Sequence, residues 1–439
     1  MATSNRQRLL STSLTTGKAA VPTVVSAEGV WFELADGRRV LDASNTAAPL
    51  GHRHPEMVEA IRAAATSPAL NEGWGWPDRE LAAEELVHTA LKDADWVGAV
   101  RFFISASEAN DVALALTQAL TGRRDLATRE RAYHGGAGMA REMTIQPQWH
   151  GGLSAAAGGV RPAPRLVDVH ALPAPTSARV TGQPDPTAGD EWLDDAREKL
   201  KRSAAVILDY SQGGVYYSPT YQDRVAALAR ETGTIWIADE TVTGFGRVGG
   251  WYQFEGASSR PDMVTMGKSL AAGSSAAGAL VLSRDLIDQL SGQSWQTYST
   301  FRGHPVAVAA IRAHLRISAR DRIYERATEL DSVMFDGLSR LAAAHPGVAR
   351  VDGRGLHWTV ELHGPDWRTW RGEEAEPLAS RVVTRALDAG VLISTSAEQT
   401  SLFLAPPLIA ESEHLNMIFE ALDDALTIAD EEYSQEQNR

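Results

Sequence analysis

The stretch that decides the fold begins with Trp236-Ile237-Ala238-Asp239-Glu240 and ends with Met263-Val264-Thr265-Met266-Gly267-Lys268. The first segment has the length and the apolar composition of a short buried strand that ends in two acids. Gly244-Phe245-Gly246-Arg247 follows it and predicts a turn. A second apolar run, preceded by Pro261-Asp262, then carries a lysine at its end. The sequence therefore predicts an acid and a lysine at the ends of two nearby strands.

An acid and a lysine in this arrangement are what pyridoxal phosphate requires. The lysine forms a Schiff base with the cofactor, and the acid keeps the pyridine nitrogen protonated so that the ring accepts electrons. Adjacent residues of a strand point to opposite faces, so only one of Asp239 and Glu240 can reach the ring. The alternative is that Lys268 is an ordinary surface lysine beside an unrelated acid, and other motifs must decide between the two.

Five further segments accompany this pair in order along the chain. They are Gly51-His52-Arg53-His54-Pro55, Ser105-Ala106-Ser107-Glu108-Ala109-Asn110-Asp111, Tyr133-His134-Gly135, Thr300-Phe301-Arg302-Gly303-His304-Pro305 and Pro406-Pro407-Leu408. Together with residues 239–247 and 261–268, they resemble the class III aminotransferases, which are pyridoxal phosphate enzymes of fold type I, the aspartate-aminotransferase fold. The resemblance spans roughly residues 25–425.

The resemblance implies an α/β fold with a mostly parallel sheet in a large cofactor-binding domain, residues 51–318. A smaller C-terminal α/β domain would comprise residues 319–439, and the N-terminal segment 1–50 would be part of it. The residue pattern agrees, because predicted strands at 100–104, 204–209, 235–238 and 277–282 alternate with predicted helices at 108–120, 221–231 and 305–319. Residues 151–190 are rich in Gly, Ala and Pro, and we expect an extended excursion there, at the surface or at the rim of the active site.

Composition excludes several classes of function. The 439 residues contain no cysteine, so disulfides, thiolate metal sites and cysteine nucleophiles are excluded, and no metal site is predicted. No run approaches the roughly 20 apolar residues of a membrane helix, and residues 1–20 lack the apolar core of a signal peptide. The net charge of −14 is spread along the chain, which argues against a nucleic-acid surface. We therefore expect a cytoplasmic enzyme with no membrane or nucleic-acid partner.

Ser105-Ala106-Ser107 opens a predicted helix directly after a predicted strand. A helix N-terminus offers free N–H groups, so phosphate binds there readily. The resemblance implies that Ser105, Ala106 and Ser107 hold the cofactor phosphate, although relatives usually have Gly at the position of Ala106. The alternative is that a serine only caps the helix.

The resemblance assigns three further contacts to the cofactor. Tyr133 is expected to lie on the face of the pyridine ring, unless it only packs at a strand end. Asp239 is the acid expected to bind the ring nitrogen. Gln212 is a candidate for the phenolic oxygen, although Asp209-Tyr210-Ser211 before it departs from the usual Glu-Pro-Val of relatives.

Thr300 occupies the position of a threonine that, in relatives, reaches the phosphate of the neighbouring subunit. This implies a homodimer with shared active sites. The alternative is a cap of the helix that begins near Pro305. Arg302, two residues further on, is a candidate for binding an anionic substrate, and it could equally face solvent.

The C-terminal segment departs from relatives that bind α-amino acids. Many of these carry an arginine three residues before Pro-Pro that binds the α-carboxylate with two hydrogen bonds, a pairing that is hard to replace. Phe403 stands there in this chain. Either the substrate lacks an α-carboxylate, or another cation such as Arg302, Arg354 or Arg247 binds it. Aromatic residues expected near the entrance suggest a flat substrate, unless they pack in the core: Trp74, Trp76, Trp251 and Tyr252.

The sequence thus predicts a PLP-dependent aminotransferase that moves an amino group between an amine or amino acid and a keto acid or aldehyde. The first alternative is other chemistry on the same cofactor and fold, namely that of a racemase or epimerase, an aminomutase, or an enzyme of β/γ-carbon elimination or C–C bond formation in specialised metabolism. All of these begin with the same proton removal, so shared motifs do not separate them. The second alternative is a non-catalytic regulatory protein that binds the cofactor.

Overall fold

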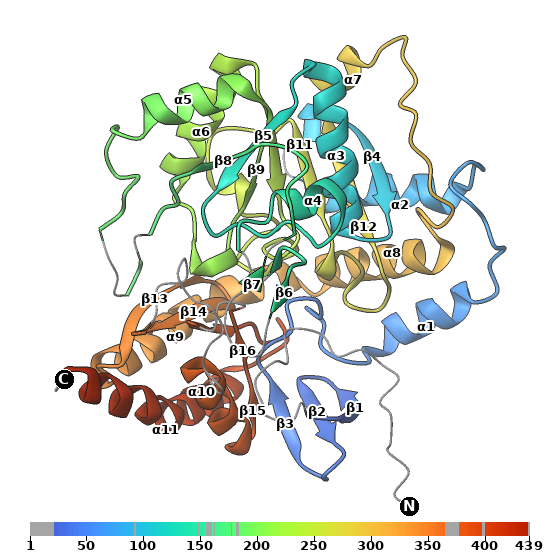
Figure 1. Ribbon diagram of the computed structural model, residues 1–439. Helices are drawn as coiled ribbons and strands as arrows, with labels where there is room; N and C mark the ends of the chain where they lie inside the picture. Colours follow the sequence, from blue (N-terminus) through green and yellow to red (C-terminus); the bar gives the residue numbers. More distant parts are fainter. Residues whose placement is uncertain are drawn as a thin grey trace, which may run out of the picture.

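The computed structural model describes most of the chain in two connected α/β parts (Figure 1). The described residues are 22–91, 94–146, 149–154, 160–161, 163–176, 178–180, 184–364, 377–396 and 400–437. The N-terminal residues 1–20, which bear on the prediction that no signal peptide is present, lie outside these ranges. Within them, no helix is both long enough and apolar enough to cross a membrane.

A seven-stranded sheet forms the centre of the larger part. Its strand order is β4-β12-β11-β10-β9-β5-β8. The strands are β4 (Val97–Phe103), β12 (Gly278–Ser283), β11 (Met263–Met266), β10 (Ile235–Asp239), β9 (Ser203–Asp209), β5 (Asp125–Arg129) and β8 (Val169–Leu172). β11, β10, β9, β5 and β8 are parallel, and only β12 runs antiparallel to its neighbours β11 and β4. The predicted mostly parallel sheet is confirmed.

The two faces of this sheet are covered by different helices, which explains the uninterrupted apolar runs of its central strands. Every residue of β9 and β10 is buried, as is usual where helices cover both faces. Ile235 and Ile237 pack toward α3 (Ala106–Thr121), whereas Trp236 and Ala238 pack into the larger core with α5 (Leu193–Arg202) and α6 (Pro219–Thr232). In the described part of the chain, five further α-helices complete this part: α1 (Pro55–Ala64), α2 (Pro77–Ala90), α4 (Gly138–Glu142), α7 (Arg284–Gln289) and α8 (Pro305–Arg320).

The C-terminal part is built on a smaller sheet of order β13-β14-β17-β16. Its elements are α9 (Ile323–Ala344), β13 (Val348–Arg354), β14 (His357–Leu362), α10 (Leu378–Asp388), β15 (Val391–Leu392), β16 (Ser394–Thr395), β17 (Ser401–Leu404) and α11 (Ser412–Gln437). The N-terminal strands β1 (Val24–Glu28), β2 (Trp31–Leu34) and β3 (Arg39–Asp42) lie below it in Figure 1. β15 pairs in parallel with β3, so the two ends of the chain share one sheet.

The region 151–190 differs from the expectation. β8 lies within it and extends the large sheet in parallel with β5, so the prediction of an excursion is wrong for these four residues. A short hairpin of β6 (Leu153–Ser154) and β7 (Val160–Arg161) precedes β8. Residues 155–159, 162, 177 and 181–183 of this region lie outside the described part of the chain. β8 is too short to give a clear periodicity, and it is a strand because β5 offers it an open edge.

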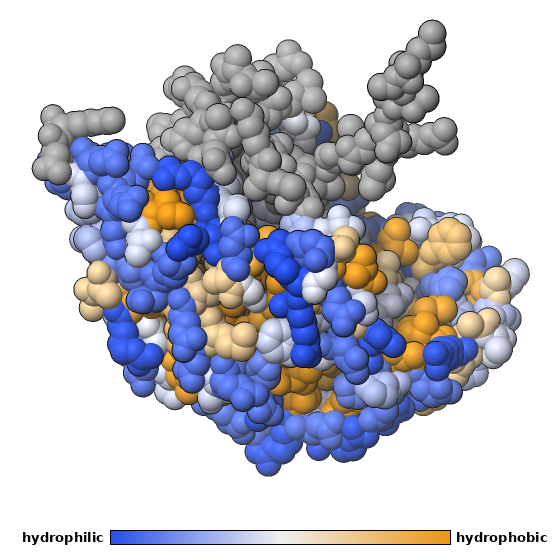
Figure 2. All heavy atoms as spheres, turned by 90° about the horizontal axis from the view of Figure 1, so that it is seen from below, coloured by the Kyte–Doolittle hydropathy of each residue, from blue (hydrophilic) through white to orange (hydrophobic). Residues whose placement is uncertain are grey.

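The surface seen from below is mainly hydrophilic, with separate apolar patches between charged side chains (Figure 2). This agrees with a chain in which 22% of the residues are charged. Patches of this kind are normal on a folded protein.

The packing of the small sheet can be tested at Gly353 in β13. It pairs across the strands with Trp358, and a side chain at Gly353 would meet the Trp358 ring and, at 2.7 Å, the carbonyl oxygen of His357. We therefore expect Gly353→Ala to lower the free energy of unfolding by about 1–3 kcal/mol, measured by urea denaturation. Gly75→Ala is the control, because no atom lies within 4 Å of its added methyl group. Equal stability of the two variants would contradict this packing.

Candidate active site

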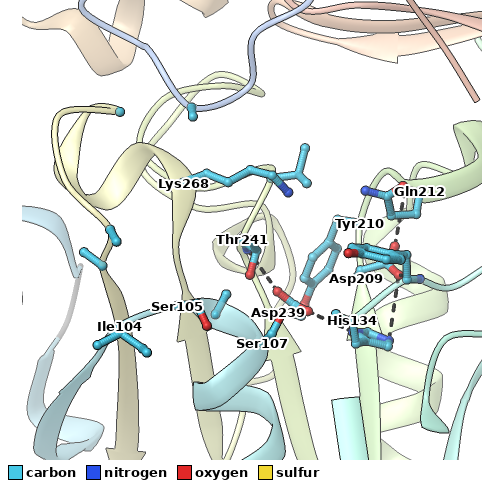
Figure 3. Close-up of a pocket in the computed structure, with 18 of the residues that line it drawn as sticks. Ile104, Ser105, Ser107, His134, Asp209, Tyr210, Gln212, Asp239, Thr241 and Lys268 are labelled. Carbon is cyan, nitrogen blue, oxygen red and sulfur yellow. Dashed lines mark hydrogen bonds and ion pairs between the residues drawn. The ribbon is translucent and has the colours of Figure 1, made fainter. Parts of the chain in front are cut away.

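A cavity of about 480 Å³ lies where strands of the large sheet end (Figure 3). Ligands of open α/β sheets bind at the carboxyl ends of the strands. The predicted site residues that line this cavity are Ser105, Ala106, Ser107, Tyr133, Gln212, Asp239 and Lys268. The structure therefore brings together seven of the eight residues that were expected to bind the cofactor.

The segment Ser105-Ala106-Ser107 forms the start of α3 on one side of the cavity. The Ser105 hydroxyl accepts a hydrogen bond from the Glu108 N–H at 3.1 Å, so Ser105 caps the helix. The helix N-terminus nevertheless opens on the cavity and presents a partial positive charge to it. Gly267 and Gly135 pack tightly here, since a Cβ on Gly267 would lie 2.8 Å from the Ala106 Cβ and a Cβ on Gly135 would touch Ser107. The two glycines thus allow the strand ends to approach this segment.

Asp239 is a buried carboxylate at the end of β10, with 3% of its surface exposed. Its Oδ2 accepts hydrogen bonds from His134 Nδ1 at 2.8 Å and Asn110 Nδ2 at 2.9 Å, and its Oδ1 accepts one from the Thr241 N–H at 3.0 Å. Burial by itself would raise the pKa of Asp239, but the hydrogen bonds from His134 and Thr241 hold it below its ordinary value. Asp239 is therefore ionised at neutral pH.

His134 is a site residue that the sequence did not identify. It is 3% exposed, and its Nε2 lies 3.0 Å from the Thr128 hydroxyl, while Nδ1 donates to Asp239. The sequence offered one signal, its place directly after Tyr133. That signal does not distinguish a partner of the acid from a histidine that caps the chain.

Glu240 points to the opposite side of the strand, as the alternation along a strand predicts. Its carboxyl group is completely buried and accepts hydrogen bonds from the Phe254 N–H at 2.7 Å and from the Thr243 hydroxyl. Burial raises the pKa of Glu240 to about 7, although these two hydrogen bonds oppose the shift. The pKa is thus lowered for Asp239 and raised for its neighbour Glu240. Of these two acids, only Asp239 lines the cavity.

Lys268 lies across the cavity from Asp239 and begins a short 3₁₀ turn (Figure 3). Its φ of 41° is in a region that side chains other than Gly seldom adopt, and such strain is often found at functional sites. Burial lowers the pKa of Lys268, whereas Asp239 and Asp209 oppose this shift. A lowered pKa increases the fraction of neutral amine, which is the form that acts as nucleophile and base.

Asp209, Tyr133 and Gln212 form the remaining side of the cavity. Asp209 pairs with Arg129, which has no exposed surface, and accepts hydrogen bonds from the Tyr133 N–H at 3.1 Å and the Gln212 N–H at 3.2 Å. The Tyr133 ring meets the Trp149 ring edge-on, with 4.9 Å between the centroids. Asp209, the first residue of the segment that departs from Glu-Pro-Val, therefore forms a buried ion pair and fixes both Tyr133 and Gln212.

Four of the predicted residues do not line this cavity, namely Thr300, Arg302, Trp76 and Phe403. Thr300 is exposed. Arg302 is 4% exposed and forms ion pairs with Glu108 at 2.9 Å and Glu72 at 3.3 Å. Trp76 is partly buried against the large core.

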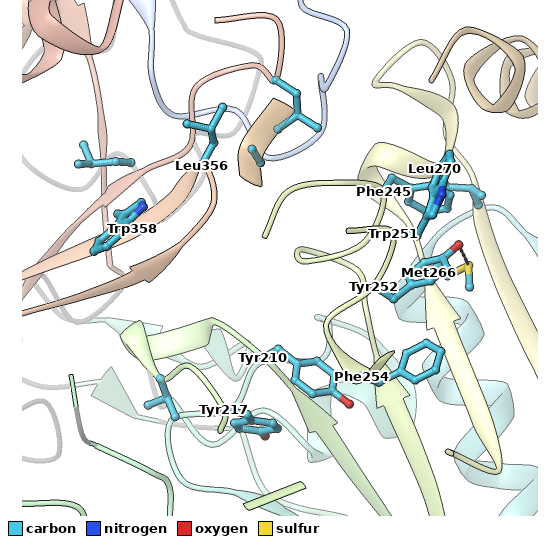
Figure 4. Close-up of a cluster of buried hydrophobic side chains, with 14 of the residues drawn as sticks. Tyr210, Tyr217, Phe245, Trp251, Tyr252, Phe254, Met266, Leu270, Leu356 and Trp358 are labelled. Carbon is cyan, nitrogen blue, oxygen red and sulfur yellow. Dashed lines mark hydrogen bonds between the residues drawn. The ribbon is translucent and has the colours of Figure 1, made fainter. Parts of the chain in front are cut away.

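The other aromatic candidates are divided between core and surface. Trp251 stacks on Tyr324, with 4.6 Å between the rings, and Tyr252 stacks on Phe254 at 5.7 Å. Both are buried in the cluster that Figure 4 shows. Trp74 is 58% exposed. For Trp251 and Tyr252 the core-packing alternative is confirmed.

Phe403 lies on β17 next to β14 and is half-buried. Its ring lies 6.1 Å from that of His357, and the His357 Nδ1 lies 2.6 Å from the Tyr216 hydroxyl. The alternative cations Arg247 and Arg354 both donate to backbone carbonyls, Arg247 to those of Leu356 and Pro406 and Arg354 to that of Tyr217.

Comparisons with known proteins find similarity over nearly the whole chain. A family model described as aminotransferase class-III matches residues 15–426. Acetylornithine aminotransferase of Mycolicibacterium smegmatis is 31% identical over 418 residues, which cover 93% of this chain and 94% of that protein. Ethanolamine-phosphate phospho-lyase homolog 1 of Caenorhabditis elegans is 28% identical over 409 residues, covering 89% and 85%. The crystal structure of an S-selective transaminase from Bacillus megaterium is 27% identical, with a TM-score of 0.87 and 97% of both chains covered.

The raised pKa of Glu240 predicts how stability depends on pH. The folded state binds a proton that the unfolded state loses above about pH 4.3, so the stabilisation by the neutral carboxyl is present below that pH and disappears as pH rises through about 7. Relative to Glu240→Gln, the wild-type free energy of unfolding should fall by on the order of 3 kcal/mol between pH 4.5 and pH 8. Urea unfolding at a series of pH values measures this.

Glu198→Gln is the matched control, because the Glu198 side chain is 69% exposed. Its stability should follow that of the wild type at every pH. Parallel curves for Glu240→Gln and the wild type would show that Glu240 is ionised in the folded state, contrary to the prediction.

Proposed function

This chain belongs to the class III aminotransferase family and uses pyridoxal phosphate to transfer amino groups, and we propose that Lys268 and Asp239 are its catalytic residues. The observation that carries the proposal is the pair itself, a partly buried lysine with a lowered pKa and a buried ionised carboxylate that line one cavity.

The residues that line the cavity suit both the phosphate and the ring of the cofactor. The N-terminus of α3, with Ala106 and Ser107, lines the cavity and offers N–H groups to a phosphate. Asp239 Oδ1 accepts a single hydrogen bond in the structure, so it has capacity to accept another from a protonated ring nitrogen. We propose that Tyr133 covers the face of the ring and that Gln212 binds its phenolic oxygen.

The residues of the proposed site then have different roles in the reaction. Pyridoxal phosphate, when bound, supplies an aldehyde that takes the amino group and a ring that accepts electrons. Lys268 would hold the cofactor through its amine, and the same amine, when free, would take the proton from the Cα of the donor as a general base. Asp239 keeps a positive charge on the ring nitrogen, and His134 and Asn110 hold Asp239 ionised. Tyr133 and Trp149 exclude water from one side.

Elimination is a second candidate reaction, favoured by the similarity to a phospho-lyase. It begins with the same proton removal by Lys268, but it expels a leaving group from the neighbouring carbon and does not leave the amino group on the cofactor. Incubation with a panel of amines and amino acids separates the two reactions. Transamination accumulates pyridoxamine phosphate, whereas elimination releases ammonia and regenerates the cofactor.

We expect Lys268 to be the residue that binds the cofactor covalently. Borohydride reduction of the holoenzyme should attach the cofactor to the peptide that contains Lys268, identified by mass spectrometry after proteolysis. Lys268→Ala should lose turnover and still bind the cofactor non-covalently. Labelling of a peptide with a different lysine would remove Lys268 from the proposed role.

We also propose a homodimer with shared active sites, located in the cytoplasm. Thr300 is exposed and does not line the cavity of its own chain. Its neighbours Tyr298 and Phe301 are 59% and 62% exposed, and Ile104, which lines the cavity, is 42% exposed. Large apolar side chains that gather at the surface mark an interaction site. These exposed residues support a second copy of the chain as the partner and Thr300 as a residue that reaches the partner's cofactor phosphate.

The pairing of β3 with β15 supports one further part of the proposal. Residues 1–50 would belong with residues 319–439 in a small domain, and residues 51–318 would form the large one. Because strands of one sheet move together, the N-terminal segment would follow the C-terminal domain in any relative motion of the two.

Mixing two defective variants tests the shared site. Thr300→Ala should weaken cofactor retention by about 1.5–3 kcal/mol, the value of one hydrogen bond to a charged group. After subunit exchange with Lys268→Ala, each hybrid dimer should contain one intact site, so about a quarter of all sites should be active. The measurement is activity at a cofactor concentration that leaves the Thr300→Ala dimer mostly empty.

If Thr300 serves its own chain, no hybrid contains an intact site. The mixture would then be no more active than the sum of the two separate variants. Full activity of a monomer in solution would contradict the proposal as well.

A further inference from the structure

A second cavity, of about 410 Å³, lies at the end of the large sheet opposite the candidate active site. It is lined by Ile235 and Trp236, which begin β10, and by Asp262, which directly precedes β11. Asp239, at the other end of β10, lines the first cavity. Pockets that bind small molecules commonly have volumes of this order. The proposed function uses no residue of this second cavity.

The ends of three helices form further sides of the second cavity. α3, whose first turn opens on the candidate active site, reaches this cavity with Leu120 and Thr121, after 16 residues or about 24 Å. α6 contributes Arg230 from its last turn, and α7 contributes Gln289. The two cavities are therefore separated by the length of a helix, so one small ligand cannot occupy both.

Positive side chains predominate in the second cavity. Its described lining has four charged residues, which are Arg123, Arg230, Arg260 and Asp262. The Asp262 carboxylate accepts a hydrogen bond from the Trp236 N–H at 2.8 Å, and burial raises its pKa, as does the nearby charge of Asp285 to a smaller extent. The whole chain, by contrast, carries a net charge of −14. The charge of this cavity is thus opposite in sign to that of the protein.

Two of these arginines also bind the backbone of the chain. Arg123 donates to the carbonyl of Thr232, the last residue of α6, at 2.7 Å. Arg260 donates to the carbonyls of Ala257 and Ser259, at 3.2 Å each. Such bonds satisfy carbonyl groups that helix ends and loops leave unpaired. Stability of the fold therefore explains the presence of Arg123 and Arg260.

The same explanation does not extend to Arg230. Its side chain is exposed, and it forms no hydrogen bond or ion pair with another residue that the structure describes. Its charge nevertheless opposes the effect of burial on the pKa of Asp262, so it acts within electrostatic reach of the cavity. An exposed cation near the C-terminus of a helix adds only slightly to stability. The guanidinium of Arg230 is thus available to a ligand.

Trp236 provides a second unpaired donor. This residue is 2% exposed and lines the cavity, and its indole N–H has no hydrogen-bond partner in the part of the chain that the structure describes. Buried donors are seldom left unpaired in folded proteins. An acceptor bound in the cavity would be a partner that the chain itself does not supply.

These donors suit a phosphoryl group. Guanidinium groups bind phosphate oxygens through two parallel hydrogen bonds. The three arginines come from different segments, namely those before β5 and β11 and the last turn of α6, so they approach the cavity from several directions. A tetrahedral phosphate accepts hydrogen bonds from several directions, whereas a carboxylate presents its two oxygens in one plane. Apolar side chains in the same lining provide contacts for the carbon part of an organic phosphate: Leu120, Ile235 and Leu286.

We propose that the second cavity binds the phosphoryl group of a small molecule, and that Arg230 is the residue that recognises it. Arg123 and Arg260 add positive charge to the site. Inorganic phosphate and an organic phosphate ester present the same oxygens, and the experiment below separates them. The proposal does not depend on the proposed function, because the two cavities share no residue.

Calorimetry on the holoenzyme tests the proposal, because the cofactor then occupies the candidate active site. Inorganic phosphate and phenyl phosphate are titrated separately into the wild type and Arg230→Gln. At least one of them should bind the wild type, and should bind Arg230→Gln at least about tenfold more weakly, since hydrogen bonds to a charged group are lost. Tighter binding of phenyl phosphate identifies an organic ester as the ligand, and equal binding identifies inorganic phosphate. No binding of either compound, or binding that Arg230→Gln leaves unchanged, would overturn the proposal.

Arg316→Gln is the matched control. Arg316 is also an exposed arginine on a helix, α8, but it does not line this cavity. This variant should bind the phosphate compound as tightly as the wild type does. Equal weakening by Arg316→Gln and Arg230→Gln would show that the compound responds only to the net charge of the protein, which contradicts a site. Circular dichroism checks that both variants are folded.

Fluorine NMR of the holoenzyme locates the bound compound. The protein is labelled with 5-fluorotryptophan, and the resonance of Trp236 is assigned by comparison with Trp236→Phe. Because Trp236 lines the second cavity, its resonance should shift when the compound is added to the wild type and should stay unchanged in Arg230→Gln. Binding to the wild type without a shift of this resonance would place the compound elsewhere and overturn the proposal.

Discussion

The buried carboxylate of Asp239 is the constraint on which the rest of the site depends. An ionised group with almost no exposure is tolerated only when hydrogen bonds replace its water. Three segments supply them: α3 through Asn110, the loop after β5 through His134, and the turn after β10 through the Thr241 N–H. Because α3 and the loop also carry Ser107 and Tyr133, which line the cavity, the bonds that keep Asp239 ionised also fix the surfaces around it. Hydrogen bonds to the Asp239 carboxylate therefore hold three segments together at the ends of the strands.

A second buried charge, Asp209, extends this organisation to the other side of the cavity. Its partner Arg129 also donates to the backbone carbonyls of Glu130 and Gln212 and to the Tyr217 hydroxyl, so the guanidinium is well bonded despite having no exposed surface. A buried ion pair contributes little net stability unless such bonds are complete, and its value is often in fixing one arrangement. Here the pair fixes Tyr133 and Gln212 relative to the sheet.

The sequence predicted the parts of the molecule that depend on local pattern. Residues 235–238 read as a buried strand because every position is apolar, and the acid that follows and Lys268 were assigned from the chemistry that they share. The contact between His134 and Asp239 could not be derived in this way, since it depends on the packing of residues 105 positions apart. β8 was missed for a related reason, because four residues become a strand only at the open edge of β5. Local sequence thus predicted the groups that are proposed to react, and tertiary packing supplied the residues that hold them in their charge states.

Arg302 shows why nearness in sequence is a weak guide to a shared role. It lies two residues after Thr300, which suggested that both enter the same site, but its guanidinium turns back to Glu108 of α3 and to Glu72 and lies over the Phe103 ring at 4.7 Å. Glu108 belongs to the first turn of α3, the turn that opens on the cavity. The ion pair therefore connects the exposed segment around Thr300 to α3, the helix proposed to bind the phosphate, in the same chain. In a dimer with shared sites, this connection would link the two cavities, because a shift of α3 in one subunit would move the threonine that its partner uses.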